Sequence, residues 1–145
     1  MIDTKETIVA MKNFLTIALV LLVAAPAFSQ VAGRTIKWKA TGVTDVLTGK
    51  KTDHFKEVIS RPDKVEFISQ NGQLAASLAI TSSNGAWADL NADGATTLKV
   101  EVGGQKGQVM FKRIAGRLLV TLLLMEGDSR AIFDIDCSGF EIINP

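Results

Sequence analysis

The chain has 145 residues, 47% of them hydrophobic, and its 16 Lys and Arg residues nearly balance its 15 Asp and Glu residues. No basic patch stands out, so nucleic acid is not an expected partner. The single cysteine, Cys137, excludes an internal disulfide, and its apolar neighbours at alternate positions favour a buried thiol.

A segment near the N-terminus has the form of a secretory signal peptide. A basic start at residues 11–13 precedes an apolar run from Phe14 to Ala25. Ala27 and Ser29 then occupy the −3 and −1 positions of a cleavage site. We therefore expect cleavage near Ser29, which leaves an exported chain, periplasmic or secreted, that begins at Gln30.

Two alternatives concern the same region. Residues 1–10 dilute the basic start with Asp3 and Glu6, which is what a start codon assigned too far upstream would produce. An uncleaved membrane anchor is the rival interpretation of the apolar run, although a spanning helix needs about 20 apolar residues. After cleavage we expect no transmembrane span.

Residues 30–145 are expected to form one domain of short β-strands. Apolar and polar residues alternate in short runs, and Gly, Asn and Asp separate these runs. Asn71-Gly72 is the strongest hairpin signal among the links. In chain order, the expected strands cover residues 35–43, 54–60, 64–69, 74–81, 86–90, 97–102, 108–114, 117–125, 131–136 and 140–143.

The short links predict how these strands pair. Links of hairpin length favour pairing between consecutive strands, and therefore an antiparallel meander. A meander of about 8–10 strands has to close or split, because a long open sheet leaves two exposed edges. We expect an all-β barrel, with a β-sandwich as the alternative.

The opening of this domain resembles that of small exported lipocalin-like barrels. The resemblance rests on Trp38-Lys39, Thr44-Asp45 and Thr48-Gly49-Lys50, together with the general meander. Gly33 stands five positions before Trp38, whereas lipocalins usually carry Gly-x-Trp. The resemblance implies a barrel that holds a ligand at its mouth.

Trp38 and Trp87 are the candidate ligand-binding residues. Two indoles inside a barrel could line a pocket for a small apolar molecule, but large aromatic side chains also fill cores. The sequence alone leaves both interpretations open.

Asp89, Asn91 and Asp93, followed by Gly94, match the first half of a calcium loop. The usual bidentate Glu is missing, because Val100 occupies its position. We therefore expect either a weak calcium site or a polar turn, and no other cofactor.

The run from Leu118 to Met125 is apolar on both faces of its strand. A sheet with one solvated face would alternate instead, so we expect cover on both sides. Either the strand is central in the domain, or Leu118, Val120, Leu122 and Leu123 form an interface, for example in a homodimer or with an envelope protein.

No arrangement of residues identifies an enzyme. Asp134 and Asp136 share a strand face and could act as an acid–base pair, but charged residues normally face solvent. His54, the sole histidine, has polar neighbours and no identifiable partner.

The leading expectation is therefore an exported, non-catalytic barrel that binds a small apolar ligand or a protein partner. The alternative is a structural or interaction module of the cell envelope with a filled core.

Overall fold

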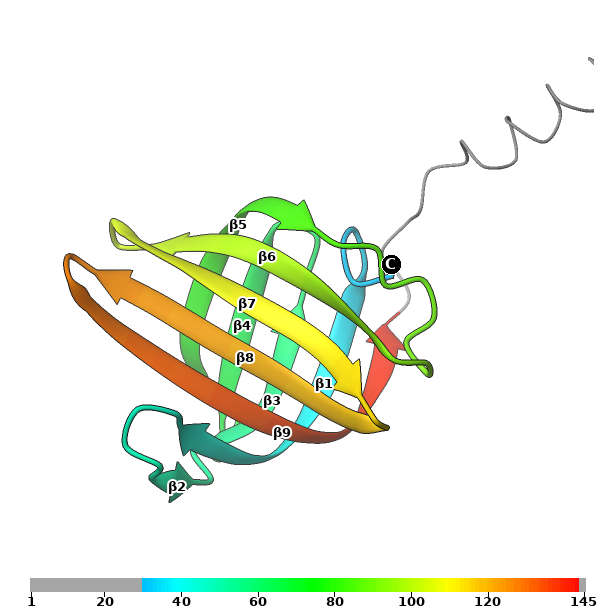
Figure 1. Ribbon diagram of the computed structural model, residues 1–145, viewed down its shortest axis with the longest axis horizontal. Helices are drawn as coiled ribbons and strands as arrows, with labels where there is room; N and C mark the ends of the chain where they lie inside the picture. Colours follow the sequence, from blue (N-terminus) through cyan, green and yellow to red (C-terminus); the bar gives the residue numbers. More distant parts are fainter. Residues whose placement is uncertain (1–29, 144–145) are drawn as a thin grey trace, which may run out of the picture.

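The computed structural model describes residues 30–143, and every regular element among them is a β-strand. Figure 1 shows the strands wrapped around a common interior. The nine strands are β1 (Thr35–Asp45), β2 (Lys51–Thr52), β3 (Phe55–Ser60), β4 (Lys64–Ser69), β5 (Leu74–Asn84), β6 (Gly94–Val102), β7 (Gln105–Ile114), β8 (Arg117–Glu126) and β9 (Ser129–Ile143).

The strands form a closed antiparallel barrel. β1 pairs with β3, each later strand pairs with the next, and β9 returns to pair with β1. Eight strands therefore make the ring, while the two-residue β2 only adds to the end of β1. The predicted meander barrel is confirmed, and the architecture is consistent with that of a lipocalin-like barrel. Closure leaves no long unpaired edge in the ring.

Turn chemistry explains one of the two-residue connections, the turn between β7 and β8. Ala115 has φ 50° and Gly116 has φ 78° between β7 and β8. Two successive residues at positive φ form the turn whose twist matches that of paired strands. This two-residue turn keeps β7 and β8 in register along their whole length, from Ile114–Arg117 to Lys106–Met125.

Three predicted strands differ from the structure. Residues 86–90 were expected to form a strand but lie in the loop between β5 and β6. The two strands expected at 131–136 and 140–143 are one strand, β9. Lys39 pairs with Gly139 and Ala40 with Cys137, so Ser138 has no partner on β1 and forms a bulge. The bulge interrupts the alternation of apolar and polar residues, which is why the sequence pattern indicates two strands.

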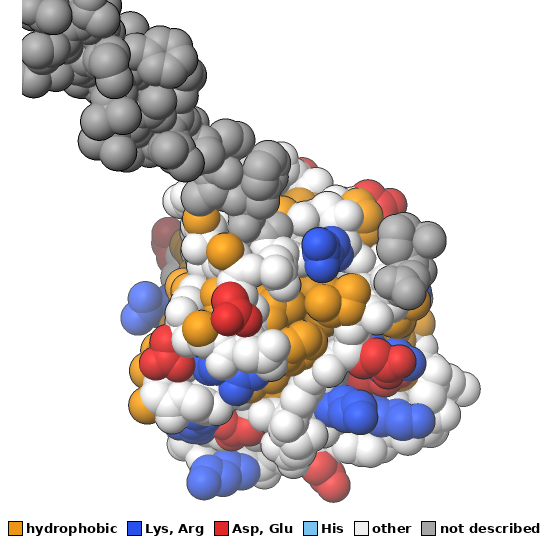
Figure 2. All heavy atoms as spheres, turned by 90° about the vertical axis from the view of Figure 1, so that its right-hand side faces the viewer, with side chains coloured by type: hydrophobic (Ala, Val, Ile, Leu, Met, Phe, Trp, Pro, Cys, Tyr) orange, Lys and Arg blue, Asp and Glu red, His pale blue; other side chains and the backbone are white. Residues whose placement is uncertain are grey.

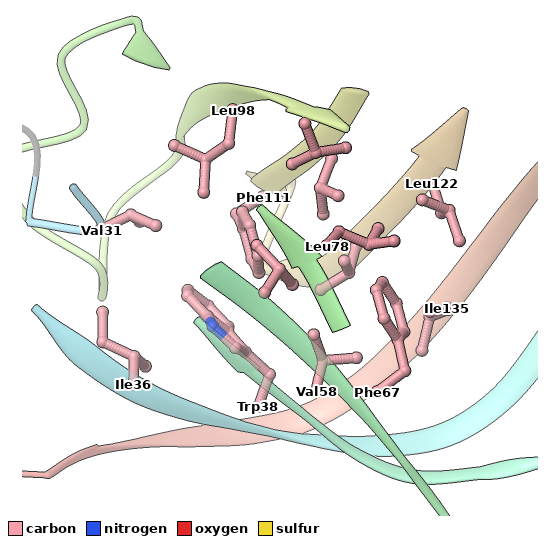
Figure 3. Packing of buried hydrophobic residues seen from close by; sticks show 14 of the residues in the cluster. Val31, Ile36, Trp38, Val58, Phe67, Leu78, Leu98, Phe111, Leu122 and Ile135 are labelled. Atoms are coloured by element: carbon pink, nitrogen blue, oxygen red, sulfur yellow. The ribbon is translucent and has the colours of Figure 1, made fainter. Parts of the chain in front are cut away.

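Alternate residues of the strands fill the interior. Figure 3 shows Trp38, Phe111, Phe67 and neighbouring aliphatic side chains pointing toward one another from different strands. Trp38 is fully buried, and its ring centroid lies 4.9 Å from that of Phe111 and 5.8 Å from that of Phe140. The Trp38 Nε1 donates a hydrogen bond to the buried Ser60 Oγ at 2.9 Å, so burial leaves no polar atom of the indole unsatisfied.

One end of the barrel is plugged by chain outside the strands. The loop between β5 and β6 and the end of β9 lie together at the right of Figure 1. Val31, Trp87 and Leu90, which come from the N-terminal segment and this loop, are all at most 2% exposed. The Gln30 N–H donates to the Trp87 carbonyl at 2.9 Å and joins the two segments. We call this the plugged end.

Figure 2 shows the molecule from the right-hand side of Figure 1, so the plugged end faces the viewer. Hydrophobic side chains gather near the middle of this face, and separate Lys, Arg, Asp and Glu side chains surround them. Apolar side chains are therefore exposed at the plugged end as well, where Ile114 is 60% and Ile142 37% exposed.

Gly94 is needed for Trp87 to lie where it does, and its replacement tests the plug. A Cβ built on Gly94 would lie 2.2 Å from Cδ1 of Trp87, so Gly94→Ala has to displace the indole. We expect the free energy of unfolding to fall by about 1–3 kcal/mol, as for other overpacked cores. Urea unfolding monitored by tryptophan fluorescence measures it.

Gly139→Ala is the matched control, because no heavy atom lies within 4 Å of a Cβ at Gly139 and its backbone φ is not positive. We expect this variant to unfold like the wild type. Equal stabilities for Gly94→Ala and the wild type would contradict the described packing of Trp87.

Candidate functional site

The structure brings the two candidate tryptophans together inside the core. The ring centroids of Trp38 and Trp87 lie 6.1 Å apart with an interplanar angle of 24°. Trp87 is 2% exposed, and its Nε1 donates to the Ala92 carbonyl at 2.9 Å. Both indoles therefore belong to the buried hydrophobic core. Of the two interpretations that the sequence left open, this placement matches core packing.

The candidate calcium loop holds the plug in place by hydrogen bonds. The Asp93 carboxylate accepts from the backbone N–H of Ala115 at 2.9 Å and from that of Gly116 at 3.3 Å. Asp89 Oδ1 accepts from the N–H of Asn91 at 3.0 Å, as in an Asx turn. Asp93 thus ties the β5–β6 loop to the β7–β8 turn.

Arg113, near the end of β7, joins the same loop to the same turn. Its Nε donates to the Leu90 carbonyl at 2.9 Å, and its Nη1 donates to the Gly116 carbonyl at 3.1 Å. Within residues 30–143, no group of three or more His, Cys, Asp or Glu side chains is placed to hold a metal ion. Calcium binding by Asp89, Asn91 and Asp93 stays a prediction.

Asp93→Ala separates the two roles of this loop. Two backbone N–H groups lose their charged acceptor, so we expect the free energy of unfolding to fall by about 1–2 kcal/mol without calcium. Asp128→Ala is the control, because the Asp128 carboxylate has no hydrogen-bond or ion-pair partner in the described part of the chain. If the loop binds calcium, millimolar calcium will raise the melting temperature of the wild type but not of Asp93→Ala.

The apolar run of β8 divides between the two faces of the barrel wall. Leu118, Val120 and Leu122 belong to the buried core, with 4%, 0% and 6% exposure. Leu119 and Leu123 alternate with them and face outward. Cover on both sides was expected, and the core supplies it on the inner face, where three of the four interface candidates lie. On the outer face Leu119 is 9% exposed and Leu123 is partly buried. Only Leu123 remains positioned to contact a partner.

The acidic pair lies on the outer face with identified partners. Asp134 Oδ1 accepts from Thr121 Oγ1 at 2.7 Å, and Asp136 Oδ1 accepts from Arg117 Nη2 at 2.6 Å. His54 is exposed beside β3. The Asp134 and Asp136 carboxylates are thus engaged by a hydroxyl and a guanidinium rather than facing each other in a recess.

Cys137 lies on the inner face of β9. Burial, aided by the charge of neighbouring Asp136, raises the pKa of the Cys137 thiol from 9.0 to about 12. A thiol with so high a pKa is a poor nucleophile near neutral pH, because the thiolate is the reactive form.

This pKa predicts a slow thiol reaction in the folded protein. At pH 8 the thiolate fraction falls roughly a thousandfold below that of an ordinary cysteine. A colorimetric disulfide reagent should therefore react slowly with native protein and rapidly after unfolding. Because the folded chain holds this proton more tightly than the unfolded chain, the free energy of unfolding falls as the pH rises from 9 toward 12. Cys137→Ala should lack this part of the pH dependence.

The end opposite the plug carries apolar residues that sequence reasoning did not single out. Five of them pack against the core and yet remain only partly buried. We call these the mouth residues: Phe55, Ala76, Val102, Leu124 and Phe133. All lie at or near the strand ends that face away from the plug, as the pairings of Phe133 with Asp45 and of Phe55 with Ser69 show.

Exposed apolar side chains stand around the mouth. Val46 and Leu47, in the turn after β1, are 45% and 54% exposed, and Leu74, the first residue of β5, is 54% exposed. The Asp45 carboxylate orders the first of these turns by accepting from the Leu47 N–H at 3.0 Å. Periodicity could have shown that the mouth residues face inward, but only the strand register shows that they meet at one end.

No helix in residues 30–143 is long and apolar enough to cross a membrane. No protein-family model, curated protein or solved structure matches this chain. The assignment of a function therefore rests on the geometry of the barrel.

Proposed function

We propose that this protein is an exported, non-catalytic binding barrel that takes an apolar group at its mouth. The group belongs to a small molecule or to a segment of a protein partner. Export is supported by the signal-peptide pattern of residues 11–29, which lie outside the described residues.

One observation carries the proposal, namely the difference in burial between the two ends. At the plugged end Val31, Trp87 and Leu90 are sealed from solvent. At the mouth, Phe133 and the other mouth residues are partly exposed although they point toward the core. A ligand can cover inward-facing apolar surface that the chain itself leaves in water. Each Å² of apolar surface that it buries favours binding by roughly 25 cal/mol.

The position of the tryptophans argues that the ligand lies near the rim of the barrel. Trp38 and Phe111 occupy the interior below the mouth with their rings 4.9 Å apart. A ligand that reached the tryptophans would have to displace this cluster. An apolar group that contacts only the partly exposed mouth residues would not need to displace it.

A second candidate function is an interaction module of the cell envelope with a filled core. The outward-facing side chains of β8 favour it, because Leu123 and Met125 leave apolar surface on the barrel wall and Met125 is 46% exposed. Such a module would use its outer face rather than its mouth.

Native mass spectrometry of the protein, purified from a host that exports it, tests both functions. For a mouth ligand we expect an additional mass that is lost on denaturation. Phe133→Ser should reduce the bound fraction, because it removes apolar surface at the mouth. Ile114→Ser is the control, since Ile114 is 60% exposed at the plugged end.

The other outcomes of this experiment would argue against ligand binding at the mouth. A bare monomer mass, with no additional species after incubation in host lipid extract, would overturn a small apolar ligand. A dimer mass that Leu123→Lys converts to a monomer would favour the interaction module. Circular dichroism confirms that each variant retains the barrel.

A further inference from the structure

We propose that a groove on the outer wall of the barrel binds an anionic amphiphile, with the anionic group held between Lys99 and Lys106. The groove has a volume of about 490 Å³, within the range of small-molecule sites. It lies on the outer wall and is separate from the mouth, because its lining side chains, apart from the core residue Val100, alternate with those that face the interior. Its lining comes from β5 to β8 and comprises Thr81, Lys99, Val100, Glu101, Lys106, Gly107, Gln108, Leu123 and Met125.

Strand register places the two lysines within reach of one anionic group. Lys99 pairs with Gln108, and Lys106 pairs with Glu101, so the lysines are diagonal neighbours across β6 and β7. Diagonal neighbours on one sheet face lie about 7–8 Å apart, which long side chains can bridge. Neither ammonium group forms an ion pair with another described residue.

The charge of the groove favours an anion. Glu101 is the one carboxylate in its lining, against the two lysines. Gln108 adds a neutral amide donor beside Lys99. Arg130, which pairs with Met125 on the next strand, brings a further cation to the edge of the groove.

The apolar wall of the groove gives it room for a hydrocarbon chain. On β8, Leu123 pairs with Gln108 and Met125 pairs with Lys106. The two apolar side chains therefore lie directly beside the polar side chains of β7. Gly107 allows this close approach, because a Cβ there would lie 2.4 Å from the Leu123 carbonyl oxygen. A carboxylate or phosphate head with a short alkyl tail matches both kinds of side chain, whereas a neutral apolar molecule leaves the lysines unused.

Calorimetric titration with octanoate and with octanol tests the groove. We expect octanoate to bind more tightly than octanol, and its affinity to fall as salt is added. The double variant Lys99→Gln, Lys106→Gln should weaken octanoate binding by about tenfold or more, since it removes two charge-assisted contacts. Lys39→Gln with Lys56→Gln is the matched control, because these exposed lysines lie on β1 and β3, across the ring from β6 and β7.

A second measurement keeps the test independent of the folding of any variant. On titration of the wild type with octanoate, the backbone amide shifts of residues 99–108 should move in nuclear magnetic resonance spectra. Phe133→Ser should leave this binding unchanged, so failure of the groove and failure of the mouth can be told apart. Equal affinity for octanol, unchanged affinity in the lysine double variant, or shifts confined to the mouth would each overturn the proposal.

Discussion

The barrel depends on burying the Trp38 indole without losing the hydrogen bond of its N–H group. An eight-stranded barrel has an interior just wide enough to be filled by side chains. Trp38 fills much of its width, and Ser60 on the neighbouring strand accepts the Nε1 hydrogen. Ser60 is itself fully buried and shields this bond from water. Replacing the indole by a methyl group would leave a cavity of the kind that costs about 3–5 kcal/mol.

The packing around Trp38 also determines what remains available for function. Because Trp87 stacks on Trp38 from the plugging loop, that end of the interior belongs to the core. Partly covered apolar surface remains at the mouth and on the outer wall of β8, and Ile114 and Ile142 are exposed at the plugged end. The proposals concern the mouth and the outer wall, because the core fills the interior around the two tryptophans.

Much of the fold could be predicted from the sequence, because it depends on local signals. Alternation placed Trp38 on an inner face, and short Gly- and Asn-containing links predicted a meander. The strand expected at 86–90 was wrong because its apolar residues are buried by the barrel end rather than by neighbouring strands. Gly85, at φ 98°, turns the chain out of the sheet just before it, and Trp87 then folds back over Gly94.

The candidate sites were less predictable, since they depend on contacts between distant segments. The role of Asp93 in tying two loops together requires Ala115 and Gly116, more than twenty residues away. Likewise, Lys99 and Lys106 become neighbours only through the β6–β7 register. Residue types such as Asp and Lys were visible in the sequence, but their partners were not.

The pairing of β1 with β9 joins the two ends of the described chain. Thr35 lies opposite Ile143, so the ladder that completes the ring joins residues about a hundred positions apart. Forming contacts of such long sequence separation costs loop-closure entropy before the contacts contribute any stability. Folds built on such contacts therefore form slowly. A growing chain therefore carries two unpaired edges until β9 is available. Folding of this barrel is thus delayed until nearly the whole domain has been made.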